Sequence, residues 1–176
     1  FHIQPFSADS PAEGPHKFNA FTASVLQMRP ESTGHLSLVS NRFADHPDIH
    51  PNYLATELDQ QTLLAGIKIT QLIAQQEPLK SLITEEYSPG ISVGASVDAD
   101  ILNWARDTAS TIYHPTGTCK MGQDRMAVVD SRLRVHGLSG LRVADASIMP
   151  LITSGNTNAP TIMIGEKLAD LVHEDA

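Results

Sequence analysis

The chain has 176 residues, of which 41% are apolar and 18% charged, a balance typical of a soluble globular protein. Its net charge is -8, and its 12 basic residues are scattered, so it lacks the clustered Lys and Arg that a nucleic-acid-binding surface needs. The one cysteine cannot form an internal disulfide, and no apolar run is long enough to cross a bilayer. Composition therefore favours a cytoplasmic protein that binds no nucleic acid and has no transmembrane segment.

The first third of the chain has the composition of a β-sheet. Phe18–Met28 is rich in aromatic and β-branched residues, and His35–Val39 alternates polar with apolar side chains. A Pro/Gly turn separates the two segments, which predicts two antiparallel neighbours. Residues 111–115, T-I-Y-H-P, are predicted to form the end of a further strand, and Leu141–Ala144 another short one.

Three helices are predicted. Thr56 can cap a helix over residues 57–76, which Pro78 ends. A second helix is expected to start at Asp98 or Asp100. Pro160 is expected to open the final helix, which carries apolar residues on one face: Ile164, Leu168, Leu171 and Val172.

Two weaker patterns suggest other chemistry. Gly90–Gly94 matches G-x-S-x-G, and Asp107 and His114 follow Ser92 in the order of an α/β-hydrolase triad. The residues before Gly90, T-E-E-Y-S-P, do not resemble the strand that this motif requires, so a loop is favoured and a serine hydrolase is kept as an alternative.

His46 and His50 have the spacing of two metal ligands on one helix face. Pro47 and Pro51 disfavour a helix there, so a solvated loop without metal is predicted.

Three segments in chain order carry a more specific resemblance. They are His114–Gly122 (H-P-T-G-T-C-K-M-G), Val135–Pro150 (V-H-G-L-S-G-L-R-V-A-D-A-S-I-M-P) and Ser154–Asp170 (S-G-N-T-N-A-P-T-I-M-I-G-E-K-L-A-D). Together they resemble the C-terminal signatures of the glucose-methanol-choline (GMC) family of flavin-dependent oxidoreductases. Residues 29–38 and 46–54 also resemble that family, so the likeness covers nearly all of the chain.

The resemblance implies an α+β fold. Residues 1–138 would form most of a substrate-binding domain with a large antiparallel sheet and flanking helices, and residues 139–176 the closing strand and helix of a Rossmann-like FAD domain. The glycine-rich turn that holds the FAD pyrophosphate is missing, with Gly137 and Gly140 the nearest approach. We therefore expect the chain to be the C-terminal portion of a larger enzyme, to work with the N-terminal portion, and to bind no FAD alone.

The family resemblance assigns catalytic roles to two residues. Oxidation of an alcohol removes a hydride, which flavin can accept, and a proton, which histidine can accept near neutral pH. His114 is the predicted proton acceptor, and Ile112 would border the substrate if the segment is extended. Asn156, eleven residues before Lys167, is predicted to hydrogen-bond the substrate oxygen.

The resemblance also implies contacts with the cofactor. Asn158 is predicted to cap the final helix, whose start at Ala159, Pro160 and Thr161 would face the flavin. Asp145 and Ala146 resemble cofactor contacts at the end of a strand. Cys119 is predicted to be a small filler without catalytic function.

The sequence thus predicts the C-terminal portion of an FAD-dependent enzyme that oxidises a primary alcohol to an aldehyde and passes electrons to oxygen, a quinone or another acceptor. A non-catalytic remnant domain that binds a partner is the remaining alternative. The alcohol itself is left open.

Overall fold

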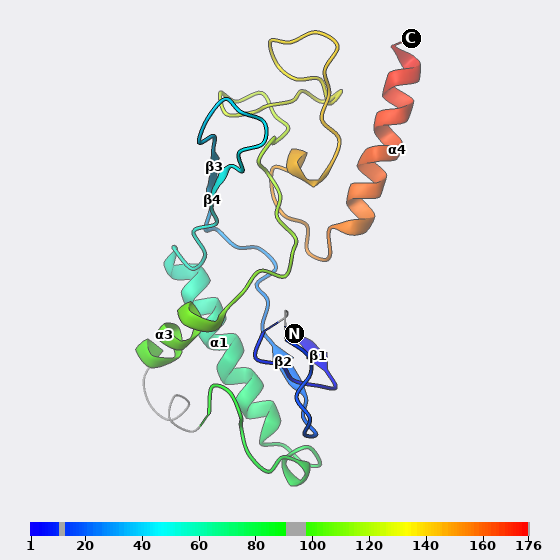
Figure 1. Cartoon of the computed structure of the whole chain (residues 1–176). Helices are drawn as coiled ribbons and strands as arrows, with labels where there is room; N and C mark the ends of the chain where they lie inside the picture. Colours follow the sequence, from blue (N-terminus) through cyan, green and yellow to red (C-terminus); the bar gives the residue numbers. More distant parts are fainter. Residues whose placement is uncertain (11–12, 91–97, 176) are drawn as a thin grey trace. The chain divides into compact units, whose positions relative to one another are not determined.

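The structure is a computed structural model that describes residues 1–10, 13–90 and 98–175 (Figure 1). These residues form two compact units. The first comprises Phe1–Ser32 and Leu54–Ala109, and the second comprises Thr33–Tyr53 and Ser110–Ala176. The predicted division at residue 138 concerns the domains of a whole enzyme and stays a prediction.

The first unit is built on two helices, α1 (Glu57–Ala74) and α3 (Asp98–Thr108), which lie side by side (Figure 1). Their contact buries three side chains, Leu64 and Ile67 from α1 and Ile101 from α3. Both helices were predicted from sequence and are confirmed. After α1, the chain forms a short 3₁₀ turn, η1 (Lys80–Leu82).

The strands pair differently from the prediction. In the first unit, β1 (His2–Gln4) pairs antiparallel with β2 (Thr22–Ser24), and in the second, β3 (His35–Ser37) pairs antiparallel with β4 (Asp48–His50). The predicted pairing of the segments that contain β2 and β3 is therefore wrong. Short alternating patterns show that a segment is extended, but they do not specify its partner. The described residues hold two small antiparallel sheets, so only the mixed helix-and-sheet class is confirmed, without the large sheet.

The start of α1 is held by a buried carboxylate. The hydroxyl of Thr56 caps the helix by accepting a hydrogen bond from the backbone N–H of Asp59. The Asp59 side chain is 2% exposed and accepts hydrogen bonds from the backbone N–H groups of Glu31 and Ser32 at 2.9 and 2.8 Å, and from the Gln27 amide at 2.8 Å. Asp59 thus fixes the segment before the second unit to the first turn of α1.

These hydrogen bonds stabilise the ionised form of Asp59. Burial alone would raise its pKa, but the hydrogen bonds from Ser32, Glu31 and Gln27 outweigh burial and lower the pKa to about 2. A carboxyl whose folded pKa lies below its unfolded value of 3.8 stabilises the fold above that value, and the contribution is lost as the pH falls toward 2. The shift corresponds to about 2 kcal/mol.

Asp59→Asn should therefore loosen the segment that Asp59 holds. The substitution keeps the size of the side chain but removes the charge that the two backbone N–H groups face. At pH 7 we expect the Glu31 and Ser32 amides to exchange hydrogen roughly 30-fold faster, the equivalent of about 2 kcal/mol.

Glu57→Gln is the matched control, because it removes a charge from the same helical turn at an exposed residue. It should leave the exchange of both amides nearly unchanged. The difference in urea stability between wild type and Asp59→Asn should shrink below about pH 4, where the unfolded carboxyl binds its proton. Equal stabilities at pH 7 would contradict this role of Asp59.

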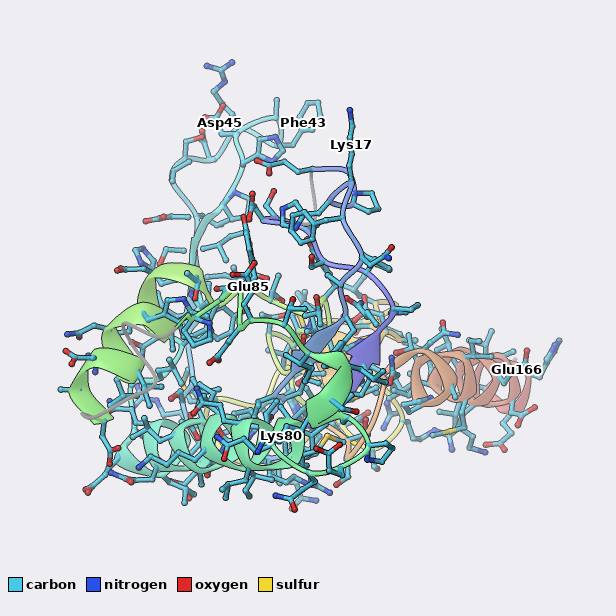
Figure 2. The ribbon with its side chains drawn as sticks, turned by 90° about the horizontal axis from the view of Figure 1, so that it is seen from below. Lys17, Phe43, Asp45, Lys80, Glu85 and Glu166 are labelled. Atoms are coloured by element: carbon cyan, nitrogen blue, oxygen red, sulfur yellow. The ribbon has the colours of Figure 1, made fainter. Side chains whose placement is uncertain are left out.

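The second unit packs its last helix, α4 (Asn158–Glu174), on an apolar cluster. Ile164 and Leu171 of α4 are buried against residues that come from the preceding segment: Val129, Leu133, Ile148 and Met149. Glu166 lies on the exposed side of the helix (Figure 2). The prediction of a final helix with one apolar face is confirmed, although α4 begins two residues before Pro160.

The strand predicted at Leu141–Ala144 is not formed. Arg142 makes one isolated bridge with Arg134, and a short 3₁₀ turn, η2 (Ala146–Ile148), follows. A strand of four residues needs a neighbour along its whole length to form a ladder. Among the described residues, the segment is bridged at Arg142 alone, where Leu141 accepts from the N–H of Val135 and the N–H of Val143 donates to Leu133.

The C-terminal end of α4 is held by ion pairs. Arg132 contacts Glu174 at 3.1 Å and Asp175 at 2.7 Å, and Arg142 also pairs with Asp175. Two carboxylates at the negative end of a helix dipole are unfavourable by themselves, and the two arginines offset this repulsion. The arginines hold the pKa of Asp175 below its usual range, Arg142 by the larger effect, so the pairing persists at neutral pH.

The β3–β4 hairpin carries an exposed loop. Figure 2 shows Phe43 and Asp45 near the end of this loop, and the Phe43 side chain is fully exposed. No helix in the described ranges is both long enough and apolar enough to span a membrane.

Candidate active site

Two of the sequence motifs are joined by backbone hydrogen bonds in the second unit. The N–H of Cys119 donates to the carbonyl of Ser147 at 3.0 Å, and the N–H of Met121 donates to the carbonyl of Ile148 at 2.8 Å. The segment after His114 therefore runs beside η2. Segments about 28 residues apart in sequence are brought together, as expected for parts of one site.

Gly117 permits the turn in this segment. Its φ is +89°, a conformation that residues with a side chain rarely adopt, whereas a Cβ there would meet the carbonyl oxygen of Met149 at an ordinary contact distance of 3.4 Å. The glycine of H-P-T-G-T thus lets the chain turn against the end of η2.

The third motif is joined to the first by a side-chain hydrogen bond. His114 Nδ1 lies 2.9 Å from the hydroxyl oxygen of Thr157, the residue before α4. Thr157 is 7% exposed, whereas the histidine is half-buried. The His114 ring thus lies at the N-terminal end of α4, held on one nitrogen, while Nε2 makes no hydrogen bond or ion pair with the residues that the structure describes.

The segment before His114 is not extended. Tyr113 has a φ of +63°, in the left-handed region, so the alternation of a strand does not apply across it. The prediction that T-I-Y-H is a strand end, with Ile112 on the same face as His114, is therefore wrong. Ile112 is 47% exposed, and its place in a substrate pocket stays a prediction that no longer rests on strand geometry.

The cap of α4 differs from the prediction. Thr157, and not Asn158, occupies the N-cap position, and Asn158 is the first helical residue. The Thr157 hydroxyl makes no capping hydrogen bond. The third helical residue is Pro160, which has no N–H to offer to a capping hydroxyl. The hydroxyl is thus available to His114.

The first turn of α4 has the character of an anion-binding helix end. The backbone N–H of Thr161 donates to the carbonyl of Thr157 at 3.0 Å, and Pro160 has no N–H. The N–H groups of Asn158 and Ala159 belong to the first turn, whose N–H groups have no partner within a helix, and no side chain caps them. These N–H groups could donate hydrogen bonds to a negatively charged or carbonyl-bearing ring edge.

The remaining predicted residues lie near these elements. The Asp145 carboxylate accepts a hydrogen bond from the N–H of Ser147 at 2.8 Å and so caps η2, in which Ala146 is the first residue. Asn156 is exposed and directly precedes the buried Thr157. Its amide is therefore free to face a ligand from the chain segment that enters α4.

Thr157 is the site residue that sequence reasoning missed. The sequence did contain a signal that the Thr157 hydroxyl has one capping donor fewer than usual. Pro160 lies three residues later, in the first turn of the helix, and has no N–H to donate to it. Its partner, His114, lies 43 residues away in the sequence, so local sequence could not predict the contact.

The weaker patterns gain no support. Ser92 lies outside the described residues. The loop predicted around His46 and His50 is wrong for Asp48–His50, which form β4; His50 bonds to Asp48 at 2.7 Å and stacks on His35. No group of three His, Cys, Asp or Glu side chains able to hold a metal occurs in the parts of the chain that the structure covers. Cys119 is half-buried and unpaired.

Comparison with known proteins gives the family. Residues 30–165 match the GMC oxidoreductase family model. Over 172 residues, 98% of this chain, the sequence is 46% identical to the oxygen-dependent choline dehydrogenase of Pseudomonas fluorescens and 44% identical to that of Escherichia coli. The chain covers 30% and 31% of those two proteins.

Solved structures agree with this result. Pyridoxine 4-oxidase from Mesorbium loti superimposes on 84% of this chain with a TM-score of 0.77 and 32% identity, and this chain covers 28% of it. An Aspergillus oryzae formate oxidase, in a variant made to study FAD modification, also covers 84% of this chain, with a TM-score of 0.78 and 32% identity; this chain covers 26% of it.

The chain therefore belongs to the GMC oxidoreductase family, as its motifs indicated. It spans about a third of the length of the choline dehydrogenases that it matches.

The left-handed backbone at Tyr113 makes a testable prediction. The Tyr113 side chain is 69% exposed, so its truncation removes few contacts. The strain of the left-handed backbone therefore decides the change in unfolding free energy. At ordinary positions alanine is more stabilising than glycine, but at a left-handed residue the Cβ costs roughly 1 kcal/mol. Tyr113→Gly should therefore be more stable than Tyr113→Ala by about 1 kcal/mol in urea unfolding of the full-length protein. If alanine is the more stable of the two, His114 is not held by the turn described here.

Proposed function

We propose that this chain is the C-terminal portion of an FAD-dependent dehydrogenase that oxidises a primary alcohol to an aldehyde, with His114 as the proton acceptor. The observation that supports this most directly is the hydrogen bond that holds His114 at the start of α4, which brings the first and third family motifs together. The 46% identity to a choline dehydrogenase over 98% of the chain makes choline the first alcohol to test.

The residues of the second unit fit FAD by their donor set. The first turn of α4 has uncapped N–H groups at Asn158 and Ala159 and a positive dipole end, both suited to a flavin ring. Pro160 and Thr161 complete this turn, and Asp145 and Ala146 are the remaining proposed contacts. The solved formate oxidase named above was studied for its FAD, which is consistent with this cofactor. The pyrophosphate would be held by the N-terminal portion of the enzyme.

FAD, when bound, supplies the acceptor for the hydride that leaves the alcohol carbon. The protein must then take the hydroxyl proton. Neutral imidazole can do this at physiological pH, since the ordinary pKa of histidine is about 6.5. His114 presents Nε2 for that proton, while its other nitrogen is bonded to Thr157.

Asn156 would serve the substrate oxygen. An amide N–H donates a hydrogen bond to developing negative charge without competing for the proton. This role is supported by the position of Asn156 directly before Thr157, whose hydroxyl contacts His114. The electron acceptor is proposed to be oxygen, in line with the names of the matched dehydrogenases, and a quinone is the other outcome of an acceptor assay.

The full-length enzyme should contain FAD and be bleached by its alcohol. Under anaerobic conditions, choline should remove the flavin absorbance near about 450 nm. Tetramethylammonium is the matched control, because it has the same cationic group but no alcohol carbon, and it should leave the spectrum unchanged. Bleaching by another alcohol and not by choline would keep the reaction class and reject the substrate. A protein that contains no flavin would reject the proposal.

Substitution of His114 tests its catalytic role. His114→Ala should retain FAD and slow reduction of the flavin by alcohol roughly 10²- to 10⁴-fold, the usual contribution of general-base catalysis. Asn156→Ala should slow it by roughly 10²-fold, because one hydrogen bond to developing charge is lost while the base survives. Rapid mixing of enzyme and alcohol measures both rates.

The double variant separates a shared role from independent ones. We express each rate of flavin reduction as a fraction of the wild-type rate. If both side chains act on the same oxygen, the fraction for the double variant should exceed the product of the fractions for the two single variants. A wild-type rate in His114→Ala would show that His114 is structural.

A further inference from the structure

We infer that Thr157 is a positioning residue that holds His114 with its proton on Nδ1, so that Nε2 accepts the proton of the alcohol. The inference rests on the proposed function and deepens it, because it assigns a role to a buried residue outside the predicted site.

The hydroxyl of Thr157 is committed to the histidine. It lies 2.9 Å from His114 Nδ1, and the side chain is 7% exposed, so water does not readily replace it. An N-cap threonine ordinarily bonds the second or third N–H of its helix, but no such bond is formed here. Pro160 at the third position removes one of those two donors.

The reaction determines which atom donates. At the end of proton transfer both ring nitrogens carry hydrogen, so Nδ1 must then be the donor and the Thr157 oxygen the acceptor. The same arrangement before transfer leaves a lone pair on Nε2. Only this tautomer passes from neutral imidazole to imidazolium without rotation of the threonine hydroxyl, and the hydrogen bond strengthens as charge develops.

The opposite arrangement would oppose the reaction. If the hydroxyl donated to Nδ1, the ring proton would lie on Nε2, and the ring would face the alcohol as a donor. Thr157 is the partner that the described residues offer to the His114 ring, and its hydrogen bond to Nδ1 is the contact through which it would bias the tautomer.

Thr157→Val in the full-length enzyme tests this role. Valine fills the same volume and keeps the backbone carbonyl that accepts from Thr161, and no capping bond is lost. We expect reduction of the flavin by the alcohol substrate to slow roughly 10- to 100-fold, the contribution of a hydrogen bond to a charged group, at unchanged flavin content. The acidic limb of the pH–rate profile should move to lower pH by roughly 0.5 to 1 unit, because the imidazolium loses its acceptor. Thr157→Ser should restore both values.

Thr70→Val is the matched control. Its hydroxyl is half-buried and bonds the carbonyl of Gly66 within α1, in the other unit. It should reproduce the wild-type rate and pH profile. If Thr157→Val also keeps both while His114→Ala is slow, the inference about Thr157 is overturned and the proposed function stands. If serine fails to restore the rate, the effect of valine is steric and the inference is again overturned.

A spectroscopic measurement decides the tautomer without turnover. In ¹⁵N-histidine-labelled oxidised enzyme, the His114 signal, assigned by its loss in His114→Ala, should report hydrogen on Nδ1 in wild type and a mixture in Thr157→Val. Hydrogen on Nε2 in wild type would overturn the inference. A wild-type rate in His114→Ala would instead overturn the catalytic assignment, while the spectrum still decides whether Thr157 fixes the ring.

Discussion

The burial of one face of α4 is the constraint on which the candidate site depends. Ile164 and Leu171 pack into the cluster that contains Val129 and Ile148, and Arg132 holds the far end of the helix through Glu174 and Asp175. A helix fixed along its length has a fixed first residue. Its N-terminal end can therefore carry groups whose position matters to within a fraction of an ångström, which a loop of the same sequence could not provide.

The chain around the candidate site has two features that are locally unfavourable for stability. A threonine at an N-cap ordinarily contributes about 1 kcal/mol through its hydroxyl. Thr157 makes no such bond and contacts His114 instead, and Tyr113 holds a left-handed backbone next to the same histidine. The missing cap and the left-handed residue are each unfavourable locally, and both persist because the surrounding packing holds them. Such locally unfavourable features are often found at functional sites.

Sequence patterns predicted the helices well and the strands poorly. The start of α1 was predicted from the capping residue Thr56, and α4 was predicted from its apolar face. Each of these signals is local, because it lies within the helix or directly before it. The partner of β2 lies near the N-terminus and that of β3 lies after it in sequence, and no local pattern encodes these choices. The site residues came from motif resemblance. Thr157 did not, since its role depends on a contact between motifs, and the Tyr113 turn was hidden within a segment that resembled a strand.

The position of His114 at the end of α4 creates an electrostatic problem that Thr157 can solve. The positive end of a helix dipole disfavours a cation, and so would disfavour the imidazolium that His114 forms in the proposed reaction. In the proposed function the same positive end would favour negative charge on a reduced flavin, so a helix placed farther away would stabilise that charge less. A neutral hydroxyl oxygen that accepts from Nδ1 stabilises the imidazolium locally without placing a second negative charge beside the flavin. An aspartate at residue 157 would stabilise the imidazolium more, but it would also cap the helix and neutralise the N–H groups of Asn158 and Ala159. Thr157, which makes no capping bond and has lost one of its two possible capping donors to Pro160, meets both requirements at once.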